Sequence, residues 1–197
     1  MQHKILIGSH NLHKIDEFRT LFKGLNLEIQ TVDLSETEPA ETGKDFAENS
    51  LIKARHYSLK YNMQAIADDS GLIIDDLDGL PGLYSARFAA EHGGFPQVLY
   101  KIKDMLNNKE SKARFICNLC LFESNTSIQW FEGIIEGTIK FTKIMQPGFG
   151  YNPIFFPLNS DKSFAELDAE GANKISHRSI AFGKLREYLV SKGSVKG

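Results

Sequence analysis

Residues 65–87, AIADDSGLIIDDLDGLPGLYSAR, place two adjacent carboxylates directly after a short apolar segment. Residues 65–67 predict a short buried strand. Asp68-Asp69-Ser70-Gly71 predicts a polar turn that ends it, because glycine accepts backbone angles that other residues avoid. In α/β proteins, functional sites lie where such strands end. The stretch therefore predicts an acidic site at a strand end, beside the plainer interpretation that these four residues only form a turn.

The two acids are expected to have different roles. Side chains of consecutive strand residues point to opposite faces, so one acid would hold the turn and the other would face a cleft. Residues 72–74 are expected to continue as a strand. Residues 77–87 contain the turn signals Asp78-Gly79 and Pro81-Gly82 and predict a long loop that shapes a pocket.

Composition limits the class of protein. The 197 residues are predicted to form one domain, residues 1–197, which buries roughly 70% of the surface of the unfolded chain. A net charge of −2 with 42% hydrophobic residues is typical of soluble globular proteins, whereas nucleic-acid-binding proteins are usually basic. The sequence has neither an apolar run of membrane-spanning length nor a signal-peptide pattern. We expect a cytoplasmic protein that binds neither nucleic acid nor membrane.

Cys117 and Cys120 have the C-x-x-C spacing of some redox and zinc sites. They lie in residues 113–122, which read as a strand, where positions three apart point to opposite faces. The sequence has no further cysteines to complete a metal site. Two buried, unreactive thiols are therefore predicted.

The N-terminal segment predicts a strand followed by a helix. Residues 4–8 predict a strand and residues 12–25 a helix, joined by residues 9–14, SHNLHK, whose Ser and Asn are good N-caps. That loop alone is a weak phosphate signal, because it lacks the Walker A spacing, and a plain helix cap explains it better. Residues 27–32 suggest another strand.

The acidic loop, residues 35–43, precedes a predicted helix over residues 46–59. Asp45 and Glu48 would cap the start of this helix. Lys53 and Arg55 are two residues apart on the helix, so their side chains cannot share a face.

The C-terminal half predicts a helix over residues 95–107, strands over residues 113–122 and 127–142, and a final helix after Ser176-His177-Arg178. Residues 148–153, GFGYNP, offer aromatic rings for stacking, although aromatics beside a strand are more often core residues. Taken together, cationic loops before helices, acidic loops and an aromatic loop suit a nucleoside triphosphate. Mg²⁺ usually takes one or two carboxylates plus phosphate oxygens, so it is the expected metal.

The sequence resembles the inosine/xanthosine triphosphate pyrophosphatases, and the resemblance covers nearly the whole chain. The motifs that carry it are Ser9-x-Asn11-x-x-Lys14 followed by Glu17-Phe18, Glu41-Thr42-Gly43, Phe46-x-Glu48-Asn49, Lys53-Ala54-Arg55, Ala67-Asp68-Asp69-Ser70-Gly71-Leu72, Pro81-Gly82-x-Tyr84-Ser85-Ala86-Arg87 and Ser176-His177-Arg178.

The resemblance implies an elongated two-lobed α/β fold with a long mixed β-sheet and a central nucleotide cleft, assembled as a homodimer. It implies Mg²⁺-dependent hydrolysis of ITP, dITP and XTP to the monophosphate and pyrophosphate. Asp69 would be the general base, and Glu41 and Asp69 would bind the metal. The residues that it assigns to substrate binding are Ser9, His10, Asn11, Leu12, His13, Lys14, Lys53, Ser70, Phe149, Gly150, Tyr151, Asn152, Ala172, His177 and Arg178. Of these, Ser9, Asn11, Lys14 and Lys53 would hold the phosphates, and residues 149–152, His177 and Arg178 the base. For His177, a packed or capping histidine is the alternative.

Two positions depart from the family pattern. Asn152 stands where the family has Asp, and Ala172 stands where it usually has Lys. Deaminated purines present a 6-oxo acceptor and an N1–H donor, which suit Lys and Asp. Asn152 can still accept from N1–H, but Ala172 offers nothing to the 6-oxo group unless Lys174 takes the place of the missing lysine. Alternative functions are a related pyrophosphatase with relaxed or pyrimidine preference, or a nucleotide-binding module without turnover.

Overall fold

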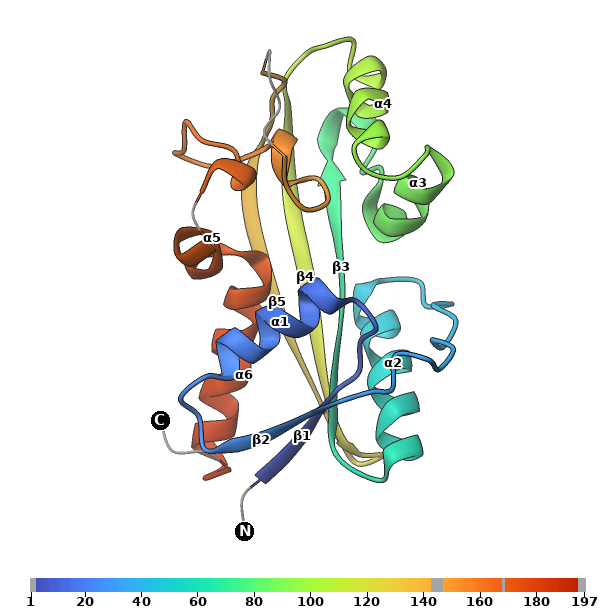
Figure 1. The fold of residues 1–197 in the computed structure, drawn as a ribbon, viewed down its shortest axis with the longest axis vertical. Helices are drawn as coiled ribbons and strands as arrows, with labels where there is room; N and C mark the ends of the chain where they lie inside the picture. Colours follow the sequence, from blue (N-terminus) through green and yellow to red (C-terminus); the bar gives the residue numbers. More distant parts are fainter. Residues whose placement is uncertain (1–2, 143–146, 168, 195–197) are drawn as a thin grey trace. The chain divides into compact units, whose positions relative to one another are not determined.

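The protein is described by a computed structural model over residues 3–142, 147–167 and 169–194, and it contains both helices and strands (Figure 1). The elements in chain order are β1 (His3–Ile7), α1 (Leu12–Phe22), β2 (Leu27–Thr31), α2 (Phe46–Tyr61), β3 (Ala65–Ile74), the 3₁₀ turns η1 (Asp75–Leu77) and η2 (Gly82–Tyr84), α3 (Ser85–Glu91), α4 (Gln97–Met105), β4 (Ser111–Ser124), β5 (Ser127–Ile139), η3 (Asn152–Ile154), β6 (Phe155–Pro157), η4 (Phe164–Glu166), α5 (Ala169–Ile175) and α6 (His177–Ser191).

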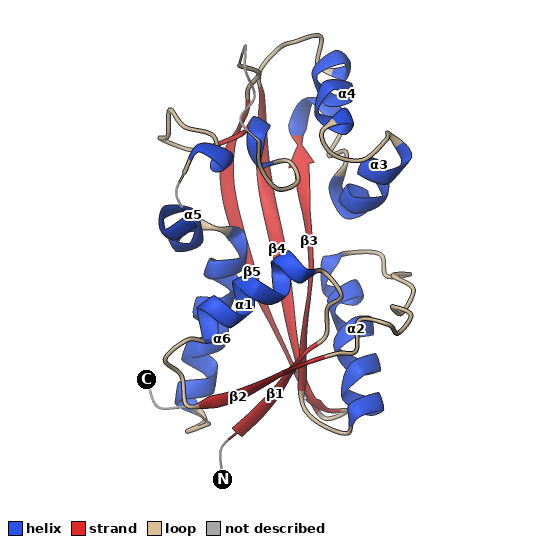
Figure 2. Ribbon diagram, in the orientation of Figure 1, coloured by secondary structure: helices blue, strands red, loops and turns tan. Residues whose placement is uncertain are grey.

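The strands form one mixed sheet in the order β2-β1-β3-β4-β5-β6 (Figure 2). β1 pairs in parallel with β2, where Ile5 lies opposite Ile29, and also in parallel with β3. β5 pairs antiparallel with β6, where Thr138 lies opposite Phe156. Parallel neighbours need a crossover, and α1 and α2 supply the connections between β1, β2 and β3. The predicted α/β fold with a mixed sheet is confirmed.

The chain divides into two compact units. The first contains Met1–Asp69, Cys117–Gly133 and Arg178–Gly197, and the second contains Ser70–Ile116 and Ile134–His177. β3, β4 and β5 contribute residues to both units, so neither unit is a continuous piece of sequence. The single domain over residues 1–197 stays a prediction.

The first unit buries apolar side chains on both faces of its strands. On one face, α1 and α6 pack over β1, β3 and β4 around Phe18, Ile66 and Phe182. On the other face, α2 packs its Ala54 against Ala67 and the neighbouring strand. Because Ile66 and Ala67 are consecutive in β3, their separation into two clusters follows directly from the alternation of side chains along a strand.

The second unit has a core of its own. It is built from the end of β3, helices α3 and α4, and strands β4, β5 and β6. Its buried residues are Leu72, Ile74, Ala89, Val98, Leu99, Ile102, Leu106, Ala113, Phe115, Ile139, Tyr151, Ile154, Phe155 and Phe164. The helix predicted over residues 95–107 is therefore confirmed as α4, and its apolar side is buried.

The predicted turn at Asp68–Gly71 is wrong. β3 runs without interruption from Ala65 to Ile74, so both acids and the glycine lie inside the strand. Turn propensity is a local preference, and pairing with neighbouring strands overrides it when the polar side chains find partners. The long loop predicted over residues 77–87 also contains η2 and the start of α3, and α5 had not been predicted.

The prediction for the two cysteines is confirmed. Both are buried in β4, neither forms a disulfide, and they belong to two different core clusters of the first unit. Burial raises the pKa of the Cys120 thiol to about 12, which makes it a poor nucleophile near neutral pH. Within the described residues, no helix combines the length and apolar character needed to cross a membrane.

Gly137 of β5 offers a test of packing in the second unit. A Cβ at this position would lie 2.4 Å from the Phe156 carbonyl oxygen and 2.6 Å from Phe155 Cζ. Gly137→Ala should therefore destabilise the protein by about 1–3 kcal/mol, measured by urea unfolding. Gly183→Ala is the matched control, because a Cβ at this position in α6 meets nothing within 4 Å. It should stabilise the protein by about 0.5–1 kcal/mol, and equal effects of the two variants would contradict this packing.

Candidate active site

The loop between β1 and α1 ends in a capped helix N-terminus. The Asn11 side chain accepts a hydrogen bond from the Lys14 amide at 3.3 Å, and Ser9 Oγ accepts from the Asn11 amide at 3.2 Å. The N-cap predicted for this loop is confirmed. A helix N-terminus carries partial positive charge, so the start of α1, where Ser9, Asn11 and Lys14 lie, favours an anion.

His10 of this loop, and Leu12 and His13 in the first turn of α1, have other surroundings. His10 Nε2 donates to the Asp33 carbonyl at 3.1 Å, and in the neutral ring Nδ1 accepts from the Tyr57 hydroxyl at 3.0 Å. The ring thereby ties this loop to the start of the acidic loop that carries Glu41. Leu12 is 60% exposed, and His13 lies 3.6 Å from Glu17.

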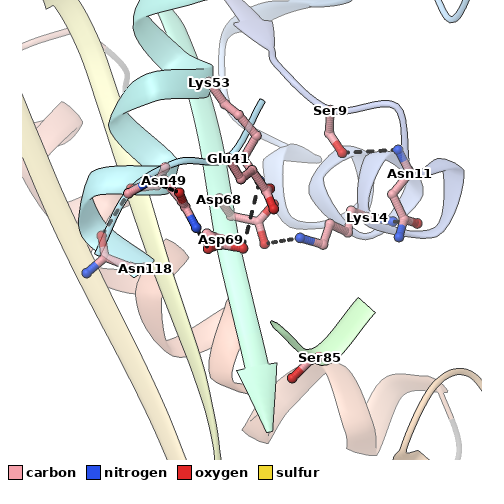
Figure 3. A network of polar contacts seen from close by, with 12 residues as sticks. Ser9, Asn11, Lys14, Glu41, Asn49, Lys53, Asp68, Asp69, Ser85 and Asn118 are labelled. Atoms are coloured by element: carbon pink, nitrogen blue, oxygen red, sulfur yellow. Dashed lines mark hydrogen bonds and ion pairs between the residues drawn. The ribbon is translucent and has the colours of Figure 1, made fainter. Parts of the chain in front are cut away.

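Asp68 and Asp69 lie in the interior of β3 with their side chains on opposite faces (Figure 3). Asp68 contacts Lys14 from α1, whereas Asp69 contacts Asn49 from α2. Both carboxylates are buried. The prediction that the two acids have different environments is confirmed, although a continuous strand produces it in place of the expected turn.

Asp69 lies beside a second carboxylate and a shared lysine. Lys53 Nζ is 2.6 Å from Glu41 Oε1 and 3.9 Å from Asp69 Oδ1 (Figure 3). Lys53 is buried, whereas Arg55, two residues further along α2, is exposed, as their spacing predicted. One ammonium group therefore lies between two acids that are far apart in the sequence.

The protein environment perturbs both charged groups. Burial raises the pKa of the Asp69 carboxyl, and the charge of Glu41 acts in the same direction, against the opposing effects of Lys53 and Asn49. For Lys53, burial alone would lower the pKa, but Asp69, Asp68 and Glu41 outweigh it and raise the pKa. Asp69 is therefore a stronger base than an exposed aspartate, and Lys53 remains a cation beside it.

The same two carboxylates are the candidate metal ligands. Within residues 3–142, 147–167 and 169–194, no group of three or more His, Cys, Asp or Glu side chains is arranged to hold an ion. Glu41 and Asp69 nevertheless both face the Lys53 ammonium, so they already favour a cation at one place. Two carboxylates completed by phosphate oxygens are a normal ligand set for Mg²⁺, and the residues fit that metal.

Asp68 belongs to a separate group of charges on the α1 and α6 face, which we call the Asp68 cluster: Lys14, Glu17, Asp68 and Arg178. Lys14 Nζ is 2.9 Å from Asp68 Oδ2, and Arg178 Nη2 donates to the same oxygen at 3.1 Å. Arg178 Nη1 donates to Glu17. Burial alone would lower the pKa of Arg178, but Asp68 and Glu17 outweigh it and raise the pKa.

The remaining predicted residues belong to the second unit. Tyr151 is buried, and its hydroxyl donates to the Ser85 carbonyl at 2.7 Å, whereas Phe149 is 46% exposed. His177 stacks on Phe115 with the ring centroids 5.0 Å apart. Three further positions, Ser70, Asn152 and Ala172, are partly buried, and Gly150 has a positive φ of 59°. Of the two aromatic rings expected to stack on a base, Phe149 is thus the exposed one.

Comparison with known proteins identifies the family of this chain. The family model of the Ham1 family matches residues 5–188. This chain belongs to the Ham1 family. A dITP/XTP pyrophosphatase from Oceanobacillus iheyensis is 42% identical over 193 residues, covering 94% of this chain and 98% of the relative. The solved structures of the Ham1 proteins from Staphylococcus aureus and Coxiella burnetii have TM-scores of 0.82 and 0.84, each at 32% identity and covering 96% of this chain and 99% of the other.

Asn49 is a residue of the candidate site that belongs to a motif of the family resemblance but had no role predicted from the sequence. It is fully buried in α2, donates from Nδ2 to Asp69 Oδ2 at 2.9 Å, and accepts from the Gly43 amide at Oδ1 at 2.8 Å. Gly43 permits this approach, because a Cβ there would lie 2.7 Å from Asn49 Oδ1. Asn49 therefore orients Asp69 and anchors the loop of Glu41. The sequence signal was the Asn in Phe46-x-Glu48-Asn49, a polar residue on the buried side of a helix.

Asn49→Ala should destabilise the protein by about 1–3 kcal/mol, because it leaves the Gly43 amide and Asp69 Oδ2 without the partner they have now. Urea unfolding at neutral pH measures the effect. Asn125→Ala, in the exposed turn between β4 and β5, is the control and should change stability by less than about 0.5 kcal/mol. An Asn49→Ala variant as stable as the control would show that these two hydrogen bonds contribute little.

Proposed function

We propose that this chain hydrolyses deaminated purine nucleoside triphosphates (ITP, dITP and XTP) to the monophosphate and pyrophosphate, and so keeps these nucleotides out of DNA and RNA. The observation that carries the proposal is the lysine held between two carboxylates, one of which is a buried Asp with a raised pKa. The relatives named dITP/XTP pyrophosphatase, at up to 42% identity over most of the chain, support the substrate class.

Asp69 is the proposed general base. A water attacks the α-phosphorus and loses its proton to Asp69, a new oxygen–phosphorus bond forms, and the bond to the pyrophosphate leaving group breaks. Burial raises the pKa of Asp69, and the metal that Glu41 and Asp69 would hold would acidify the attacking water, so both effects favour this proton transfer near neutral pH. The hydrogen bond from Asn49 keeps its carboxylate oriented before the substrate arrives.

The cationic groups of the first unit are proposed to bind the phosphates. Ser9, Asn11 and Lys14 lie at the N-terminus of α1, and Lys53 lies beside Asp69. Their charges and hydrogen-bond donors would stabilise the negative charge that moves onto pyrophosphate. His10 would act indirectly, through the contacts that its ring makes with Tyr57 and the Asp33 backbone.

Glu41 and Asp69 are proposed to hold Mg²⁺ together with the substrate phosphates. When bound, the metal would neutralise phosphate charge and acidify the attacking water. With the metal in place, the Lys53 ammonium would be available to a phosphate oxygen, because the same carboxylates no longer need it as their main counter-ion. We also propose, on the family resemblance, that the protein acts as a homodimer in the cytoplasm.

The base-binding residues are proposed by resemblance: Phe149, Gly150, Tyr151, Asn152, Ala172 and His177, with Ser70 against the substrate. Tyr151 would support the loop from the core, and the exposed Phe149 ring would stack. A relaxed base preference is the second candidate function, because Asn152 and Ala172 lack the charges that suit N1–H and a 6-oxo group.

Asp69→Asn should lower pyrophosphate release by about 10²–10⁴-fold while leaving nucleotide binding largely intact, because the amide cannot accept the proton of the water. The assay is release of pyrophosphate from ITP, dITP, XTP, ATP, GTP, dTTP and UTP with Mg²⁺. Asp16→Asn, at an exposed position of α1, should behave as wild type. Turnover of Asp69→Asn near the wild-type rate would remove Asp69 as the base, and binding without turnover in the wild type would favour the binding-module alternative.

The double variant Asn152→Asp with Ala172→Lys should sharpen the preference for ITP and XTP over ATP and GTP. Its two new charges match a donor and an acceptor that distinguish these bases, and one such polar contact typically changes selectivity by roughly tenfold or more. The ratio of kcat/KM values for ITP and ATP measures the effect. An unchanged ratio would show that the two departures from the family pattern do not affect base selection.

A further inference from the structure

The Asp68 cluster joins two positive and two negative side chains, so its formal charges balance. The four side chains differ in how much of their surface is exposed to solvent. Their side chains are 1% exposed for Asp68, 6% for Arg178, 13% for Glu17 and 17% for Lys14. Lys14 is therefore the cation of the cluster that lies nearer to solvent, and it belongs to the helix N-terminus that is the proposed phosphate site.

Arg178 is held more firmly than Lys14. Its guanidinium contacts Asp68 Oδ2 through Nε at 3.4 Å and Nη2 at 3.1 Å, and it contacts Glu17 through Nη1. A planar guanidinium with several directed hydrogen bonds is a rigid partner. Lys14, in contrast, contacts Asp68 through one flexible ammonium group.

Binding a phosphate through Lys14 requires its ammonium to turn at least partly away from Asp68. A buried carboxylate that loses its counter-ion is strongly destabilised. Asp68 would keep Arg178 during this exchange, because the guanidinium contacts the same oxygen from α6. The presence of a second cation on Asp68 thus lowers the cost of releasing the first.

We propose that Arg178 is a positioning residue for Lys14: by keeping Asp68 paired, it allows the Lys14 ammonium to leave for a substrate phosphate. This inference rests on the proposed function, in which Lys14 binds the phosphates. It differs from the role in base recognition that the family resemblance assigns to Arg178, because the guanidinium is buried against two acids of the first unit.

A mutant cycle with inorganic tripolyphosphate, which has no base, tests the proposal. Calorimetry at constant Mg²⁺ compares the wild type with Lys14→Gln, Arg178→Gln, Asp68→Asn and the double variant Asp68→Asn with Arg178→Gln. Arg178→Gln should raise the Kd on the order of tenfold, as Lys14→Gln does, because Lys14 can then no longer leave Asp68. Asp68→Asn should not weaken binding, and the double variant should recover most of the affinity lost in Arg178→Gln.

A role of Arg178 in base recognition predicts a different result. If Arg178 reads the base, Arg178→Gln should bind tripolyphosphate as the wild type does and should change the ratio of kcat/KM for ITP and ATP. Either result would overturn the proposal, as would a double variant that binds no better than Arg178→Gln. Arg19→Gln, at an exposed position of α1, is the matched control and should change neither quantity.

Arg178→Gln leaves a buried carboxylate with less compensation and can impair folding, so Arg178→Lys provides a second variant. It keeps the positive charge and should bind tripolyphosphate within a few-fold of wild type. Loss of that affinity in a folded Arg178→Lys would overturn the proposal. Loss of folded protein lowers the stoichiometry of the titration, whereas the proposed role changes the Kd of the molecules that bind, so the two effects are measured separately.

The cycle also separates this inference from the proposed function. Tripolyphosphate binding needs no turnover. A wild-type chain that binds tripolyphosphate but hydrolyses no nucleotide would therefore contradict the proposed function. The mutant cycle would still decide the role of Arg178. A wild-type chain that does not bind tripolyphosphate, or whose binding is unaffected by Lys14→Gln, would overturn the role proposed here.

Discussion

Two neighbouring carboxylates share one strand, and the pleat of that strand turns them to opposite faces of the sheet. The arrangement of the first unit depends on this constraint, because each buried acid needs its own cations and hydrogen-bond donors. Asp69 obtains them from α2, through Asn49 and Lys53, and Asp68 obtains them from α1 and α6, through Lys14 and Arg178. The helices that cover the two faces of β3 therefore also supply the partners of the two acids.

Burial gives the two acids different chemistry. On the α2 face, two carboxylates and one lysine leave an excess of negative charge that suits a divalent cation, and the pKa of Asp69 is raised. On the α1 and α6 face, two acids and two bases balance, and Asp68 Oδ2 is contacted by a cation from each helix, Lys14 and Arg178. The proposed general base and an acid held in ion pairs thus follow each other directly in the sequence.

The order of helices and strands was largely predictable, because apolar periodicity and capping residues are local signals. Asn11 and Asp45 cap α1 and α2 as expected, and the two cysteines are buried on opposite faces of β4. The extended conformation of residues 68–71 was not predictable in the same way. These residues favour turns locally, and only pairing with neighbouring strands and contact with distant cations make an extended conformation stable there.

The sequence by itself determined the α/β class, the family resemblance and the residue types able to bind a triphosphate and a metal, since these reside in composition, spacing and motif. Only the tertiary structure decided which of those residues share an environment. It showed that Lys53 joins Glu41 to Asp69, that Asn49 orients Asp69, and that Arg178 is paired with Asp68 and Glu17. Such partnerships depend on distances between side chains remote in the chain, and buried charges select their partners only once the fold has excluded water.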